Sequence, residues 1–236
     1  MAFEVLKSPD QIRESRRKLR RQGLSCATPN WLAFLYQRQF LRGIRIGDDL
    51  KSWDVLRTVS FLESHVAKNE PILDIGAYAS EMPCILHRLG YSKVAGIDLN
   101  PDVLRMPYSK SVNYRVGNFM QTDFLDRFFT AITAISVIEH GFDARALFAE
   151  LSRLLKSGGY FIASFDYWPQ KISTDGIDLF GMSWTIFSRS EVEDFTEVAR
   201  SYGFRPFASS DFESADRPIN CMERDYTFAW MALVRA

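Results

Sequence analysis

The pattern of apolar and polar positions changes near residue 70, and the two parts of the chain predict different structures. Residues 8–68 place apolar side chains at helical spacing, with Ser8-Pro9-Asp10 as a helix start and Gly23 as a stop. After residue 70, short apolar runs alternate with segments that have the spacing of an amphipathic helix. This order predicts a helical N-terminal part followed by a β-α repeat.

Three helical segments and no strand are expected in the N-terminal part. They begin near Ser8, Pro29 and Asp48, and the third ends near Ala67. The second and third segments contain aromatic residues at apolar positions, which we expect to pack in the core. These residues are Trp31, Phe34, Tyr36, Phe40 and Trp53.

Seven apolar runs in the second part are expected to be strands with helices between them. Asp143, for example, can cap a helix that contains Leu147 and Leu151 and ends at Gly158-Gly159. This alternation predicts a three-layer α/β sandwich with a seven-stranded, mostly parallel sheet. The predicted strands are Ile72–Ile75, Val94–Ile97, Val112–Val116, Ala131–Val137, Tyr160–Phe165, Phe204–Ala208 and Tyr226–Val234.

Length and composition agree with a single such domain. A chain of 236 residues with 47% hydrophobic content can bury one sizeable core. No repeat, low-complexity tract or linker-like stretch divides the sequence. We expect residues 1–69 to form a helical extension and residues 70–236 to form the α/β domain, with an insertion at 167–187.

Charge and cysteine content narrow the class of protein. Lys+Arg and Asp+Glu both number 29, so the whole chain has no electrostatic bias toward nucleic acid or an anionic membrane. Cys26, Cys84 and Cys221 form no CxxC spacing, which is typical of reduced thiols. The sequence begins without a signal-peptide pattern, and no apolar run approaches the ~18 residues of a transmembrane helix. These features predict a soluble, cytoplasmic protein.

Two acidic residues lie near the ends of neighbouring predicted strands. Asp74 precedes Ile75-Gly76 at the end of the first strand, and Asp98 ends the second. Ligands of open α/β sheets bind outside the carboxyl ends of the strands, and an acid about 20 residues beyond the first turn can accept hydrogen bonds from ribose hydroxyls. The pair therefore indicates a cofactor that carries a nucleoside. The alternative is that both acids cap the turns after their strands.

Further motifs occur in a fixed order along the chain. Leu73-Asp74-Ile75-Gly76 and Asp98 are followed by Gly117-Asn118-Phe119, Ser136-Val137-Ile138-Glu139-His140 and Leu154-Leu155-Lys156-Ser157-Gly158-Gly159. With these motifs, residues 70–235 resemble the class I S-adenosylmethionine-dependent methyltransferases. The last two motifs are similar to the LEH and LKPGG stretches of the branch that includes ubiquinone-pathway O-methyltransferases.

The resemblance implies roles for the residues that match family positions. Asp74 would orient the glycine turn and the methionine part of the cofactor, and Gly76 would let the backbone approach it. Asp98 would hold the ribose hydroxyls, whereas Asn118 would either bond the adenine amino edge or be an ordinary turn residue. Ser136 would face the methionine part through its backbone, and Leu99 and Phe119 would lie beside the adenine. The full set that the resemblance implies for S-adenosylmethionine is Asp74, Gly76, Ala77, Tyr78, Asp98, Leu99, Asn118, Phe119 and Ser136.

The glycine turn departs from the family pattern. The family commonly has Gly-x-Gly-x-Gly, whereas this series is Gly76-Ala77-Tyr78-Ala79-Ser80. A tyrosine at the second glycine position costs strain or blocks the approach of the backbone. The turn is either rebuilt, with Tyr78 over the cofactor, or part of a degenerate site; we favour a rebuilt turn because the other implied contacts are present. The absence of GxGxxG makes a Rossmann dehydrogenase the lesser alternative.

His140 is the candidate catalytic residue. It follows the predicted fourth strand beside the expected methyl donor, and an ordinary histidine pKa near ~6.5 suits a general base. The alternative is that His140 caps the helix at Asp143. No HExxH motif or Cys/His cluster is present, so no metal site is predicted. Weaker candidates are Asp166 and Tyr167 as bases, and Asp166, Asp175 and Asp178 as carboxylates that either hold a metal or are solvated in a loop.

Two features bear on the methyl acceptor. The aromatic residues of the 167–187 insertion can stack on a sugar or aromatic ring, or cover a sheet edge. The basic run of the first helix can contact a phosphate of the acceptor, or form an ordinary solvated face. These residues are Tyr167, Trp168, Phe180, Trp184 and Phe187 in the insertion, and Arg13, Arg16, Arg17, Lys18, Arg20 and Arg21 in the helix.

The resemblance thus implies an S-adenosylmethionine-dependent methyltransferase that acts on oxygen or nitrogen of a small molecule. A sugar, a nucleotide sugar and a natural-product intermediate are the acceptors considered, and the N-terminal helices would cap the site. The alternative is a module that kept the fold, lost catalysis and binds through its surface. A small-molecule acceptor is the expected partner, without nucleic acid or membrane, and a homodimer is one option for the assembly.

Overall fold

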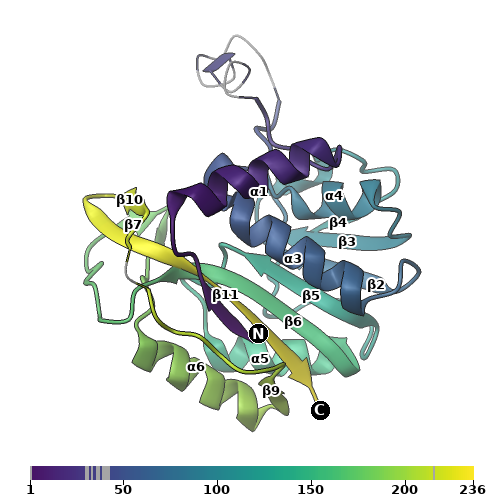
Figure 1. Cartoon of the computed structure of the whole chain (residues 1–236). Coiled ribbons are helices and arrows are strands. Elements are labelled where there is room, and N and C mark those ends of the chain that lie inside the picture. The colour runs from purple at the N-terminus through teal and green to yellow at the C-terminus, as the bar shows by residue number, and fades with distance from the viewer. Residues whose placement is uncertain (1, 30–31, 33, 36–37, 39–42, 215) are drawn as a thin grey trace.

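A computed structural model describes residues 2–29, 32, 34, 35, 38, 43–214 and 216–236. One sheet separates two layers of helices, which confirms the predicted three-layer sandwich (Figure 1). Helices α1 (Pro9–Arg21), α3 (Ser52–His65) and α4 (Met82–Arg88) lie on one face. Helices α5 (Ala144–Leu154) and α6 (Arg189–Ser201) lie on the other. No helix among these described residues is long and apolar enough to cross a membrane.

The parallel strands lie side by side in the order β4-β3-β2-β5-β6. The chain runs outward from β2 through β3 to β4 and then returns to place β5 on the other side of β2. The order therefore reverses at β2, and ligands of open α/β sheets bind at the carboxyl ends of strands at such a point. The strands are β2 (Pro71–Ile75), β3 (Lys93–Asp98), β4 (Asn113–Val116), β5 (Phe129–Ile135) and β6 (Leu155–Tyr167).

Antiparallel strands complete the other side of the sheet. β11 (Arg224–Arg235) pairs with β6, and its second edge pairs with β1 (Phe3–Val5), β9 (Phe204–Pro206) and β10 (Ile219–Cys221). In the described part of the chain the sheet has nine strands rather than the seven predicted, and β1 lies where no strand was expected. Phe3-Glu4-Val5 is too short to show a recognisable periodicity, and pairing with the edge of β11 makes it a strand.

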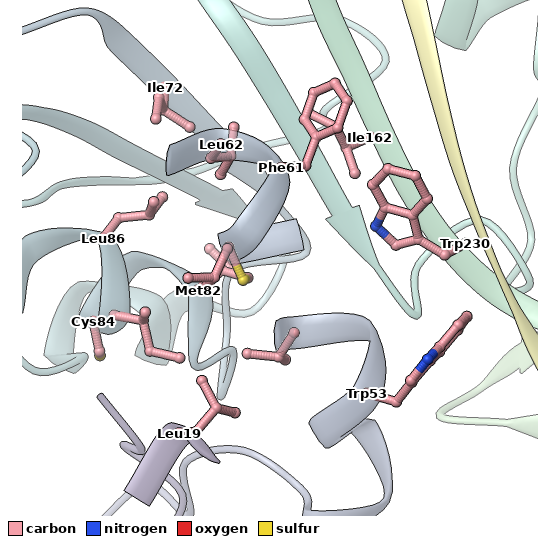
Figure 2. Close-up of a cluster of buried hydrophobic side chains, with 14 of the residues drawn as sticks. Leu19, Trp53, Phe61, Leu62, Ile72, Met82, Cys84, Leu86, Ile162 and Trp230 are labelled. Atoms are coloured by element: carbon pink, nitrogen blue, oxygen red, sulfur yellow. The ribbon is translucent and has the colours of Figure 1, made fainter. Parts of the chain in front are cut away.

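Each face of the sheet has its own hydrophobic core. Side chains of α1, α3 and α4 converge on the sheet in one cluster, which includes Leu19, Leu62, Met82 and Trp230 (Figure 2). The Trp230 indole also donates a hydrogen bond to Thr58 of α3 at 3.0 Å. The N-terminal helices therefore pack as part of the fold over the strands that carry the predicted site.

Two local predictions differ from the structure or lie outside it. Gly158-Gly159 does not end a helix: α5 ends at Leu154, and the glycine pair lies in β6 beside a shift in register with β5. A Cβ on Gly159 would lie 3.1 Å from the Thr130 carbonyl oxygen, so close strand pairing explains this glycine. The predicted second helical segment falls largely outside the described residues, which do not include Trp31, Tyr36 and Phe40.

The remaining short elements connect these layers. The 3-10 helix η1 (Asp49–Lys51) leads directly into α3, and η2 (Pro101–Arg105) follows β3. The hairpin of β7 (Asp178–Leu179) and β8 (Met182–Ser183) lies within the predicted insertion. Ser188 and Glu191 form a capping box that starts α6.

Candidate active site

The turn after β2 is built around Gly76. Its φ is +70°, and a Cβ at this position would lie 2.4 Å from a methyl carbon of Val137. The backbone N–H groups of Gly76 and Ala77 both donate to the Ile97 carbonyl at the end of β3, at 3.0 and 3.1 Å. Only glycine satisfies this conformation and this close approach together. The turn is therefore fixed against the ends of two other strands.

Tyr78 does not carry the strain expected of it. The left-handed conformation falls one residue later, on Ala79 at φ 61°, and the Tyr78 ring is half-buried against the core under α4. The Ala79 carbonyl accepts a hydrogen bond from Gly47 N–H at 2.8 Å. The turn is thus rebuilt around a different residue, and a loop of the N-terminal extension supports it.

Asp98 links the ends of β2 and β3. Its carboxylate accepts a hydrogen bond from Tyr78 N–H at 2.9 Å and another from Asn100 N–H at 2.8 Å. The side chain remains partly exposed, and a carboxylate has about four lone-pair sites, so it keeps acceptor capacity for further donors. Asp98 therefore combines the capping role with a geometry suited to bind hydroxyl groups.

Asp74 is buried between β2 and β5. The Thr133 hydroxyl of β5 donates to its carboxylate at 2.5 Å. Burial raises the pKa of Asp74 to about 7, although hydrogen bonding to the Thr133 and Ser80 side chains opposes the rise. Its hydrogen-bond partners are side chains, and among the described residues Asp74 makes no hydrogen bond to the backbone of the glycine turn.

The residues expected around the adenine lie at the same edge of the sheet. Leu99 is 61% exposed just beyond Asp98. Gly117 N–H donates to the Asp98 carbonyl at 2.9 Å, which holds the end of β4 beside the end of β3. The Asn118 side-chain oxygen accepts from Met120 N–H at 2.9 Å, a turn contact that leaves its amide N–H₂ group for another partner. Phe119 is half-buried against the core on the α5 face.

Ser136 and His140 follow the end of β5. Ser136 has φ 58°, a left-handed conformation that is strained for a residue other than glycine. Its hydroxyl donates a hydrogen bond to Glu139. Burial lowers the pKa of His140, whose Nδ1 is buried and has no hydrogen-bond partner in the described part of the chain. The cap of α5 is Asp143, which accepts from Ala146 N–H at 2.7 Å. The structure therefore confirms Asp143 as the cap and leaves the His140 ring free for another role.

Charged residues that the sequence analysis did not group together gather near the ends of β5 and β6. We call Lys51, Asp54, Glu139 and Asp166 the buried charged cluster. Lys51 Nζ lies 3.6 Å from Asp166 and 3.9 Å from Asp54. Glu139 stands beside His140 in a recognised motif, and Asp166 was a weak base candidate, whereas no pattern in the sequence marks Lys51 or Asp54. Only the packing of α3 on the sheet brings them together.

Five of the six basic residues in α1 form the solvated face that was one of the two predictions, whereas Arg16 has a role of its own. Arg16 is buried and donates to both oxygens of Glu81, at 2.7 and 2.9 Å, directly after the glycine turn. It also donates to Ser52 at the start of α3 at 2.8 Å. The other basic residues of the run are half or fully exposed or, like Arg20, paired at the surface with Asp49. Arg16 therefore fastens the N-terminal extension to the turn.

The aromatic residues of the insertion are mostly structural. Tyr167, Trp168, Trp184 and Phe187 are buried, whereas Phe180 at the tip of the β7–β8 hairpin is 86% exposed. The Phe180 ring makes an edge contact with His140, and Trp184 forms a backbone bridge with His140. Most of these side chains therefore cover the sheet edge, and the hairpin lies over the end of β5.

The carboxylates considered for a metal do not come together. Asp175 and Asp178 are exposed, and Asp166 is buried. Asp175 accepts a hydrogen bond from the Ser173 hydroxyl within its own loop, at 2.9 Å. In the part of the chain that the structure describes, no group of three or more metal-binding side chains is found.

The chain is similar to known proteins in both sequence and structure. Residues 73–163 match a family model described as a methyltransferase domain. Geranyl diphosphate C-methyltransferase from Streptomyces coelicolor A3(2), solved with S-adenosyl-L-homocysteine, is similar with a TM-score of 0.58 at 19% identity, over 76% of this chain and 80% of that chain. The [4+2]-cyclase SpnF is similar with a TM-score of 0.61 at 15% identity, over 80% and 83%. No curated protein matches the sequence.

Residues 73–163 thus match a methyltransferase domain, and the chain has the fold of these methyltransferase structures. The match and the neighbours support an S-adenosylmethionine-dependent methyltransferase of class I. One neighbour is a cyclase, so the fold by itself does not determine the reaction. The similarity to the ubiquinone-pathway branch stays a prediction.

Proposed function

We propose that this protein transfers a methyl group from S-adenosylmethionine to oxygen or nitrogen of a small molecule. The observation that carries the proposal is the position of Asp98. Its carboxylate is fixed by two backbone N–H groups at the reversal point of the sheet, beside the glycine turn, and retains acceptor capacity. A ribose with two vicinal hydroxyls is the ligand that such an acid at this position suits.

The residues present fit the cofactor. Gly76 allows the tight turn against Val137 at the end of β2, and Leu99 is exposed beside Asp98, so an adenosine can lie along the ends of β2, β3 and β4. Asp98 would hold the ribose, Asn118 would bond the adenine through its free amide group, and Phe119 would pack nearby. The methionine part would then lie toward Asp74, Ala77, Tyr78 and the Ser136 backbone.

The bound cofactor supplies an electrophilic methyl group, and the protein supplies alignment, exclusion of water and a proton acceptor. His140 is the proposed base because its Nδ1 is buried without a partner and burial keeps the ring neutral. A His140→Ala variant should keep its affinity for S-adenosylhomocysteine and lose turnover. Unchanged turnover with intact cofactor affinity would remove His140 from the mechanism.

The second candidate function is a binding module without catalysis. The observation that favours it is Tyr78, which replaces a family glycine. The left-handed conformation of Ala79 weakens this alternative, because the turn keeps its hydrogen bonds to β3 without strain at Tyr78.

Cofactor binding separates the two functions. Calorimetric titration and thermal unfolding should show that S-adenosylmethionine and S-adenosylhomocysteine bind the wild-type protein. A ligand at 100 times its Kd adds about 2.7 kcal/mol to the free energy of unfolding. If neither compound binds or raises Tm, the proposed function is wrong.

A further inference from the structure

The buried charged cluster lies beside the proposed methyl-transfer site. Glu139 comes three residues after Ser136, and Val137 between them touches the space that a Cβ on Gly76 would occupy. Asp166 lies near the end of β6, and Lys51 and Asp54 approach from η1 and the start of α3. Elements of both the N-terminal extension and the sheet therefore meet next to the glycine turn.

Most members of the cluster have partners. Ser164 donates its hydroxyl to Asp54 at 2.9 Å, and the Trp184 indole donates to Asp166 at 2.7 Å. Lys51 lies within ion-pair distance of both acids, and its Nζ is 3.3 Å from the centre of the Phe228 ring. One cation is thus shared by two carboxylates.

Glu139 is the member without adequate partners. It is 1% exposed, its Oε1 accepts from the Ser136 hydroxyl, and its Oε2 has no hydrogen-bond partner among the residues that the structure describes. Asp54 Oδ1 and Lys51 Nζ are also buried without hydrogen bonds. An unpaired buried acceptor is costly, and the one ammonium donor of the cluster, Lys51, already lies between Asp54 and Asp166. Glu139 Oε2 therefore needs a donor from outside the chain.

The balance of charges in the cluster indicates which charge that donor carries. Three carboxylates and one ammonium leave an excess of negative charge in a buried place, which must be offset by protons or by a cation. Burial and the neighbouring Asp166 raise the pKa of Glu139 to about 8, and burial raises that of Asp54 to about 6. The carboxylates of Asp166 and Asp54 outweigh burial and raise the pKa of Lys51, so this side chain remains the cation.

From this arrangement we infer that the buried charged cluster is the acceptor subsite and that it binds the ammonium group of an amine substrate. Glu139 Oε2 accepts a hydrogen bond from the ammonium group, and Asp166 and Asp54 provide the surrounding negative potential. The inference deepens the proposed function and rests on it, because it selects nitrogen over oxygen as the methylated atom. The proton that the ammonium must lose goes to Nδ1 of His140.

The same charges disfavour other acceptors. A phosphate or diphosphate brought beside Glu139 and Asp166 meets like charge, and Lys51 is already shared by two acids. The similar C-methyltransferase binds geranyl diphosphate in the presence of Mg²⁺, whereas the described residues of this chain include no cluster of three or more metal-binding side chains. A neutral alcohol can form hydrogen bonds with the carboxylates, but it does not compensate their excess negative charge.

Matched pairs of amines and alcohols test this inference by binding, without turnover. The full chain saturated with S-adenosylhomocysteine is titrated by calorimetry with phenethylamine and 2-phenylethanol, and with hexylamine and 1-hexanol. Each amine should bind at least tenfold more tightly than its alcohol. Affinities that do not favour the amines, including no binding of any probe, overturn the inference. Failure of S-adenosylhomocysteine to bind would instead overturn the proposed function.

Two substitutions with opposite expected effects separate recognition from a structural role. Glu139→Gln keeps the shape of the side chain and should abolish the preference for amines while leaving the Kd for S-adenosylhomocysteine within twofold. Lys51→Met removes the competing cation and should tighten amine binding. Glu150→Gln, a buried glutamate bonded to Thr122 and Arg153 elsewhere in the fold, is the matched control and should not change the preference. Weaker amine binding in both cluster variants, or an unchanged preference in Glu139→Gln, contradicts the inference.

Discussion

At the scale of single residues, Asp98 has two tasks that a single substitution can separate. The carboxylate caps two backbone N–H groups and is proposed to bind ribose hydroxyls. An asparagine keeps one acceptor oxygen for the backbone but loses the charge that strengthens bonds to hydroxyls.

Asp98→Asn should therefore weaken S-adenosylhomocysteine binding by about 1.5–3 kcal/mol, with a smaller loss of stability. Titration calorimetry measures the first effect and thermal unfolding the second. Asp102→Asn, at an exposed carboxylate of η2 that pairs with Arg105, is the control. Equal affinity of Asp98→Asn and wild type would assign Asp98 to the turn alone.

Gly76 and Gly23 form a natural matched pair, because both have φ +70°. A Cβ on Gly23 meets nothing within 4 Å, whereas one on Gly76 meets Val137 at 2.4 Å. Gly23→Ala should cost about 1–2 kcal/mol of unfolding free energy through backbone strain. Gly76→Ala should cost about 1–3 kcal/mol more through overpacking, and Val137→Ala should recover part of it. Chemical denaturation gives these values, and an equal loss at both glycines would exclude the steric argument.

At the scale of elements, α1 acts as a brace for the glycine turn. Its Arg16 reaches Glu81 after the turn, Ser52 at the start of α3 and the Asp48 carbonyl, so one side chain holds three segments. The ion pair is buried on both sides, with side-chain exposures of 5% and 1%. Removal of one partner would leave a buried charge without compensation.

Arg16→Met should lower the free energy of unfolding by about 3–5 kcal/mol, because Glu81 stays buried. The same variant should weaken S-adenosylhomocysteine binding through the turn. Arg13→Met, at an exposed position of the same helix, should change neither quantity appreciably. Wild-type cofactor affinity in a folded Arg16→Met protein would show that the contacts of Arg16 do not influence the cofactor site.

At the scale of the whole molecule, three buried acids make stability depend on pH in an unusual direction. Burial raises the pKa of Asp54 to about 6, of Asp74 to about 7 and of Glu139 to about 8. The folded protein therefore binds more protons than the unfolded chain above the ordinary carboxyl pKa, and it loses stability as pH rises through these values.

Tm should fall between about pH 6.5 and pH 8.5, a range in which Asp74 and Glu139 lose their protons. Glu139→Gln removes one of these groups and should make the fall shallower. Thermal unfolding across this range in constant ionic strength provides the measurement. A Tm that stays level or rises, or an identical slope in the variant, would mean that these carboxyls do not retain protons.

Much of the α/β domain and one edge of the candidate site could be predicted from sequence, since both depend on local patterns. Apolar periodicity placed the parallel strands, Ser8 and Asp143 marked helix starts, and the spacing of Asp74, Gly76 and Asp98 indicated the cofactor edge. These signals can be recognised in the sequence because a strand, a cap and the turn that follows a strand involve residues close along the chain.

Tertiary structure alone decided the features that join distant segments. β1 exists because β11 offers it an edge to pair with. Arg16 is an anchor rather than a solvated charge, and Lys51 and Asp54 join Glu139 and Asp166 only when α3 packs on the sheet. Periodicity shows that a helix has a buried face but not which partner covers it, and the chemistry of the acceptor subsite depends on that partner.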